Sequence, residues 1–177
     1  MTYRQLIAAS EVHLQYTGAA TPGPGHLTTT FRFGAEWMHN RMCELQQPAP
    51  PPFDPSIDYT GYGLFKYGAC LIGFLLSIAG LYTCGLLYTP LSVGVFYLFE
   101  IHFLFLFPLL IDRAPRPLLT SIKAAWEIGI GRCLITVIPI AAYMMIGLFR
   151  KTNPLRNWYI GCLSIIIWYN HAIRNRL

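Results

Sequence analysis

The sequence predicts an all-α integral membrane protein with three to four transmembrane helices and a polar N-terminal arm. Only 12% of its 177 residues are charged and 54% are hydrophobic, whereas soluble domains carry about 25% charged residues. The run from Tyr67 to Ile111 contains one charged residue, Glu100, and is long enough for two spans of about 20 residues each. Lys and Arg flank the apolar runs, which is typical of membrane anchors that face lipid headgroups.

Composition divides the chain into three parts. Residues 1–47 form an extramembrane arm, in which apolar spacing predicts short amphipathic helices over 3–16 and 28–47. Residues 48–60 form a proline-rich linker, because proline lacks the amide donor that a helix needs and favours extended geometry. Residues 61–177 form the membrane domain.

The first two spans are expected over residues 67–88 and 91–111. Thr89-Pro90 divides them, since threonine can cap a helix and proline is favoured at the first helical position. The connection is only a few residues long. The two spans should therefore form a tight antiparallel hairpin.

Two further spans are expected over residues 133–149 and 156–174. The first is an apolar run bracketed by Arg132 and Arg150, whose side chains can extend toward the headgroups. The second has aromatic pairs near both ends, as interfacial belts do; a re-entrant or interfacial helix is the alternative there. Residues 118–128 suit a short helix lying at the membrane interface.

Charge gives a topology with one conflict. The uncharged hairpin turn belongs outside and the basic loop after the second span belongs inside, which places the N-terminus inside. With four spans the basic loop 150–156 falls outside, against the positive-inside rule. A third segment that does not cross fully would remove the conflict.

Small residues form a stripe along the first span at i, i+4, i+7 and i+11, namely Gly73, Ser77, Gly80 and Cys84. Small side chains allow helix backbones to approach closely in lipid. The stripe is interpreted either as an assembly face or as the packing face against the second span.

Glu100 lies near the middle of the second predicted span. An isolated carboxylate in hydrocarbon costs several kcal/mol, so such a residue usually faces a partner or a cavity. It is interpreted as a protonated or paired group that locks two helices or subunits together. The alternative is an acid or base, or a polar contact to a hydrophobic ligand.

His102 follows two residues later, a rotation of about 200° around a helix. The two side chains therefore point to nearly opposite sides and cannot form an acid–base dyad. His102 could ligate a haem iron or contact a quinone, and an interhelical hydrogen bond is the simpler interpretation.

Glu36, His39 and Cys43 share one face of the second arm helix. Glu-x-x-His is half of a di-iron pattern, but the sequence holds no second copy. We therefore expect no metal and interpret the face as solvated or partner-facing.

Basic residues are expected to contact lipid headgroups or partners. They are Arg113, Arg116, Lys123, Arg132, Arg150, Lys151, Arg156, Arg174 and Arg176.

These observations favour a non-catalytic accessory subunit of a multi-subunit membrane complex, of the respiratory or another energy-transducing type. Its expected partners are other membrane subunits and the lipid bilayer, not nucleic acid, with bound phospholipid and no cofactor. The mitochondrial inner membrane is favoured over a bacterial cytoplasmic membrane. The alternatives are a small intramembrane enzyme that acts on a lipid or isoprenoid through Glu100, and a component of a proton or ion pathway.

Overall fold

The structure is a computed structural model that describes residues 1–17, 27–45, 49–149 and 155–174. Within those ranges the regular structure is entirely helical. The elements are α1 (Tyr3–Thr17), α2 (Leu27–Leu45), α3 (Tyr59–Cys84), the 3-10 helix η1 (Leu86–Leu91), α4 (Ser92–His102), α5 (Leu106–Ile111), α6 (Pro117–Ile128), α7 (Ile130–Leu148) and α8 (Arg156–Ala172).

Three segments of the described chain are long and apolar enough to cross a membrane. They are α3, the segment Leu86–Ile111 and α7. The prediction of an all-helical chain with long apolar helices is confirmed to that extent.

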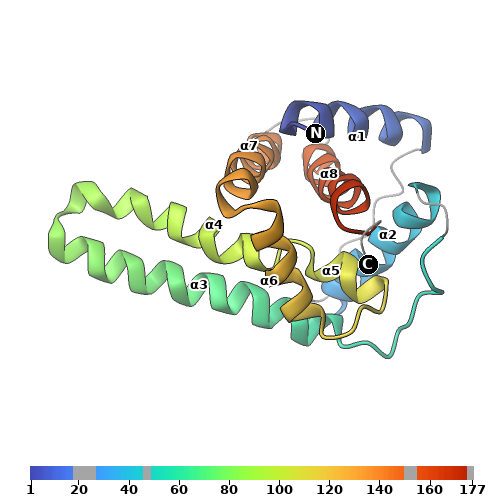
Figure 1. Cartoon of the computed structure of the whole chain (residues 1–177). Helices are drawn as coiled ribbons and strands as arrows, with labels where there is room; N and C mark the ends of the chain where they lie inside the picture. Colours follow the sequence, from blue (N-terminus) through green and yellow to red (C-terminus); the bar gives the residue numbers. More distant parts are fainter. Residues whose placement is uncertain (18–26, 46–48, 150–154, 175–177) are drawn as a thin grey trace.

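Helices α3 and α4 lie side by side and project together from the rest of the molecule (Figure 1). The carboxylate of Asp58 starts α3 by accepting a hydrogen bond of 2.8 Å from the amide of Gly61, as an N-cap residue does. At the far end Gly85 adopts a φ of 134°, which is accessible because glycine has no Cβ. The chain then turns through η1 into α4. We call α3, η1 and α4 the hairpin.

The second apolar segment is not one continuous helix. We expected a span over residues 91–111, but α4 ends at His102 and α5 begins at Leu106. Pro108 explains the break, because its ring would clash with the carbonyl of Leu104 in a continuous helix and it has no amide to donate. The part beyond the break is core, where Phe105, Leu106 and Leu109 are fully buried.

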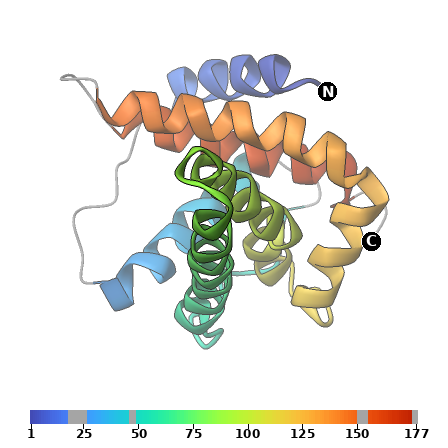
Figure 2. The ribbon, with the colours of Figure 1, turned by 90° about the vertical axis from the view of Figure 1, so that its left-hand side faces the viewer.

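Helices α7 and α8 pack against each other across the direction of the hairpin. Figure 2 looks at the hairpin from its tip and shows α7 running across the view with α8 behind it. Eight residues of α8 are buried, among them Ile160, Leu163 and Ile166. These two helices are the segments in which the third and fourth spans were predicted.

Helix α6 occupies Pro117–Ile128, close to the predicted residues 118–128. Pro117 stands at its first turn, where a missing amide costs nothing. Gly129 has a φ of 96° and separates α6 from α7. The chain can therefore change direction sharply between the two helices.

The two N-terminal helices share one core with the rest of the chain. They match the predicted helices over 3–16 and 28–47, and their buried residues Leu6, Ala35 and Met42 belong to the same cluster as Phe105 and Ile166. The proline-rich linker thus connects elements that pack together.

Candidate functional site

The base of the hairpin carries a buried ion pair between its two helices. Lys66 Nζ on α3 lies 3.4 Å from Glu100 Oε1 on α4, and the two side chains are 7% and 18% exposed. The ammonium also lies 5.1 Å from the centroid of the Tyr67 ring. Removing one partner of such a pair leaves the other charge unpaired in an apolar environment, at a cost of about 3–5 kcal/mol.

The partner of Glu100 was missed by the sequence interpretation. Lys66 stands one residue before the predicted span 67–88, outside the apolar run that contains Glu100. In an antiparallel hairpin the residues that bound its uncharged run come together at the base, and Lys66 and Glu100 are the first charged residues on either side of the tip. Those two flanking charges are the signal that could have identified the pair.

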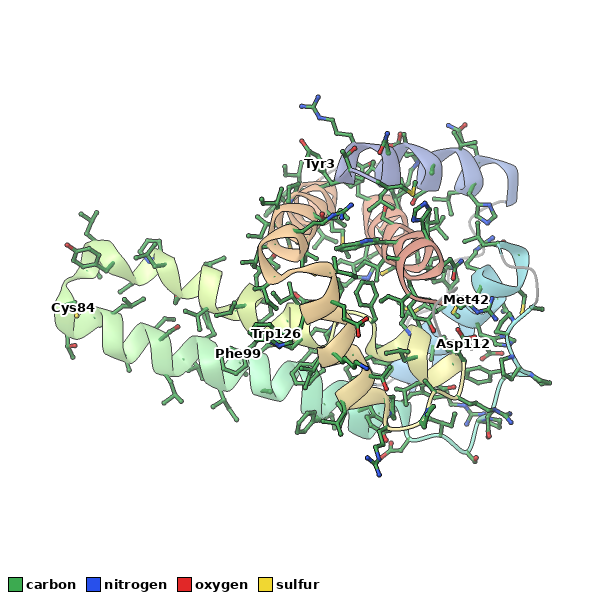
Figure 3. The ribbon with its side chains drawn as sticks, viewed as in Figure 1. Tyr3, Met42, Cys84, Phe99, Asp112 and Trp126 are labelled. Atoms are coloured by element: carbon green, nitrogen blue, oxygen red, sulfur yellow. The ribbon has the colours of Figure 1, made fainter. Side chains whose placement is uncertain are left out.

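Glu100 lies near the middle of the candidate span Leu86–Ile111, as predicted, but near one end of the hairpin. It lies two residues from the end of α4, where the hairpin joins the body. Figure 3 shows Cys84 at the far end of the hairpin, whereas Phe99, the residue before Glu100, lies close to the body. Between Lys66 and Glu100 the sequence contains no Asp, Glu, Lys, Arg or His.

His102 points away from the ion pair. Its Nδ1–H donates to the carbonyl of Leu98 at 2.7 Å, and its ring lies edge-on to Trp126 of α6, with 6.1 Å between the centroids. The hydroxyl of Ser121 donates to the carbonyl of His102 at 2.8 Å. The side chain thus contacts α6 while Glu100 contacts α3, as their spacing predicted.

The small residues of the stripe lie in two different environments along α3. Gly73 is buried, and a Cβ placed there would lie 2.7 Å from Cε2 of Phe99. Gly80 and Cys84 are exposed, and a Cβ on Gly80 would meet no atom within 4 Å. The stripe therefore packs internally near the body and is uncovered toward the tip.

A second buried acidic group joins the core segment to α8. Asp112 follows α5, and its Oδ2 accepts hydrogen bonds from the hydroxyl of Tyr169 at 2.7 Å and from Nε of Arg174 at 3.0 Å. Asp112 Oδ1 is buried without a hydrogen-bond partner among the described residues. Arg174, which was expected to face lipid or a partner, thus lies in an internal ion pair.

The other basic residues of the expected contact set lie in different settings. Arg113 binds Asp54 at 3.5 Å and the carbonyl of Pro52 at 3.2 Å, which fastens the linker to the body. Arg116, Lys123 and Arg132 are exposed, Arg156 is half-buried, and Arg150, Lys151 and Arg176 lie outside the described residues.

Two further contacts involve linker residues, one within the linker at Asp54 and one between the linker and His39 of α2. A hydrogen bond from the Ser56 hydroxyl holds the pKa of the Asp54 carboxyl below its usual value. His39 Nε2 donates to the carbonyl of Pro51 at 2.9 Å, and Cys43 Sγ lies 3.8 Å from the same nitrogen. The face of α2 with Glu36, His39 and Cys43 is therefore partly covered by the linker.

The described residues contain no group of three His, Cys, Asp or Glu side chains arranged to hold a metal ion. Comparison of the chain with protein-family models, with curated proteins and with solved structures yields no match.

Proposed function

We propose that this chain is a non-catalytic accessory subunit of a multi-subunit membrane complex, anchored by a hairpin that crosses the bilayer. The observation that carries the proposal is the exposed apolar surface of the hairpin. Leu76 in the middle of α3 is 69% exposed and Leu87 at the tip is 87% exposed. Large contiguous apolar patches on a protein surface mark contacts with membranes or other proteins.

The length of the hairpin supports a complete crossing. From Lys66 to Gly85 an α-helix rises about 28 Å at about 1.5 Å per residue, close to the hydrocarbon thickness of about 30 Å. The ion pair of Lys66 and Glu100 then lies at one boundary of the hydrocarbon and the uncharged turn lies at the other.

Aromatic residues at both ends of the hairpin support the same placement. Tyr82 and Tyr88 are exposed at the tip, while Tyr67 and Trp126 are exposed near the base. Tyrosine and tryptophan are enriched at both membrane–water interfaces, where their rings stay apolar and their polar groups stay hydrated.

A single crossing hairpin also removes the conflict in the topology. The two ends of the hairpin lie on one side, so the N-terminus and Arg113, Arg132 and Arg174 share that side. The basic loop 150–156 joins two helices of the body and need not be translocated. The arrangement then follows the positive-inside rule throughout.

The uncovered small residues near the tip support membership of a larger complex. Gly80 and Cys84 leave a surface on which the backbone of another membrane helix can approach closely. Within the hairpin itself, Gly73 makes room for the ring of Phe99.

Anchoring is tested by alkaline carbonate extraction of membranes that contain the full chain. Leu76→Lys places an ammonium near the middle of the bilayer, at a cost of about 2.5–3.5 kcal/mol, and should release part of the protein. Val12→Lys, on an exposed position of α1, is the matched control and should stay with the membrane. Extraction of the unaltered protein would contradict the anchor.

Membership of a complex is tested by native mass spectrometry after mild detergent extraction. We expect the 20.1 kDa chain to leave the membrane together with other subunits. A stable monomer or homodimer would contradict the subunit assignment and leave the anchor standing.

A further inference from the structure

Helix α7 has one face against the body and one face that no described residue covers. The inner face carries Cys133, Val137 and Ile140, all buried. The outer face of α7 consists of the exposed apolar residues Ile135, Ile138, Met145 and Ile146, and the exposed Phe149 follows the helix directly. These positions share one side of the helix at helical spacing from Ile135 onward, so they form one uncovered stripe.

The outer face of α7 lies on the side from which the hairpin projects. In Figure 2 the tip of the hairpin faces the viewer, and α7 lies in front of its partner α8. The inner face packs on α8, so the outer face points the opposite way, toward the viewer. Helix α7 also contacts α4. The uncovered apolar surfaces of the hairpin and of α7 therefore belong to two helices that are in contact.

The charges around this face suit phospholipid headgroups. Arg132 is exposed at the start of α7 and is the one charged residue of that helix. In the sequence Arg150 and Lys151 follow its last residues. An apolar helix face with basic residues at its ends is typical of helices that lie in the interface and attract anionic lipids.

An exposed tryptophan lies near the same surface. Trp126 on α6 is 64% exposed and contacts His102 at the end of α4. Figure 3 shows it close to the base of the hairpin. Tryptophan prefers the headgroup level of a membrane, which is the level that the ion pair assigns to the base of the hairpin.

We infer that α7 lies in the plane of the membrane, with its outer face in the leaflet that the hairpin enters first. Its ligand is a phospholipid surface, and Arg132 binds the headgroup phosphates. The inference rests on the proposed anchor, because the hairpin fixes which surface α7 meets. Helix α7 is then a second, shallow contact and not a span.

Photo-crosslinking with two lipid probes tests this inference. The full chain is reconstituted into vesicles of phosphatidylcholine and phosphatidylglycerol that contain a phospholipid with a diazirine either near the glycerol or at the acyl-chain end. Labelled peptides are then identified by mass spectrometry. We expect the glycerol-end probe to label α7, and the chain-end probe to label the middle of α3 and α4 but not α7.

A pair of variants sharpens the test. Ile135→Asp combined with Ile146→Asp puts two carboxylates on the outer face, at positions that the fold leaves exposed. This variant should lose the label on α7 and keep the label on the hairpin. Val12→Asp on α1 is the matched control and should keep both.

Three outcomes would overturn the inference, and each is distinct. Labelling of α7 by the chain-end probe as strongly as α3 would mean that α7 crosses the membrane. An unlabelled α7 beside a labelled hairpin would mean that a protein or water covers its outer face, with the anchor unaffected. An unlabelled hairpin would contradict the proposed anchor itself.

Discussion

Lys66 and Glu100 form an ion pair of 3.4 Å that joins the two helices of the hairpin where it leaves the body. Beyond this pair the hairpin contains no charged residue, and its outward surface is largely apolar. The pair therefore marks the level at which the polar part of the chain ends. It also gives the carboxylate of Glu100 a charged partner within the protein.

Lys66 and Glu100 should stabilise the fold as a pair, so that replacing either residue alone costs more stability than replacing both. Lys66→Met or Glu100→Leu leaves one charge buried and should lower the free energy of unfolding by about 3–5 kcal/mol. The double variant replaces both charges with apolar groups and should recover most of that loss. Thermal unfolding in detergent measures all four proteins as a double-mutant cycle.

The same cycle separates the structural role of Glu100 from an acid–base role. If Glu100 carried a proton in catalysis, the double variant would fold but any activity of the complex would remain lost. Recovery of assembly and activity together in the double variant would support the ion pair. Additive losses in stability would contradict the coupling between the two residues.

Gly147 should be essential to the contact between α7 and α8. A Cβ at this position would collide with Cβ and Cγ of Asn157, whose amide donates to the carbonyl of Tyr143 at 3.0 Å. Gly147→Ala should therefore destabilise the protein by about 1–3 kcal/mol through overpacking, measured by thermal unfolding. Gly131→Ala is the control in the same helix, because a Cβ there meets nothing within 4 Å. Equal stability of the two variants would contradict the described packing.

The hydroxyl of Tyr169 should stabilise the buried carboxylate of Asp112. Tyr169→Phe removes a hydrogen bond of 2.7 Å to a charged acceptor and should lower the free energy of unfolding by about 1.5–3 kcal/mol. Tyr3→Phe removes only an exposed hydroxyl that accepts a hydrogen bond from Arg4. This control should change stability by less than about 0.5 kcal/mol. Chemical denaturation of both variants measures the difference, and an unchanged Tyr169→Phe protein would refute the interaction.

The sequence predicted the features that depend on local patterns. The helical class, the position of the uncharged run and the bounds of α6 followed from apolar spacing, proline positions and charge. The sequence interpretation does not identify Asp58 as the N-cap of α3. The helix begins at Tyr59 and not at the predicted residue 67. That difference left Lys66 outside the predicted span and hid the ion pair.

The features that depend on tertiary packing could not be read from hydropathy. Eight of the 17 residues of α8 are buried in protein, and its apolar residues resemble a lipid-facing span because both environments exclude water. Helix α7 runs crosswise to the hairpin because Gly129 redirects the chain, which no periodicity encodes. The pairing of Arg174 with Asp112 likewise depends on residues far apart in the sequence.

The measurement that tests the crossing hairpin most directly uses two native cysteines. Cys84 is exposed at the tip of the hairpin and Cys43 is exposed on α2 in the body. Sealed vesicles with uniformly oriented protein are treated with a membrane-impermeant maleimide before and after permeabilisation, and the labelled peptides are identified by mass spectrometry. If the hairpin crosses the bilayer, Cys43 and Cys84 react from opposite sides. Reaction of both from the same side would contradict the crossing.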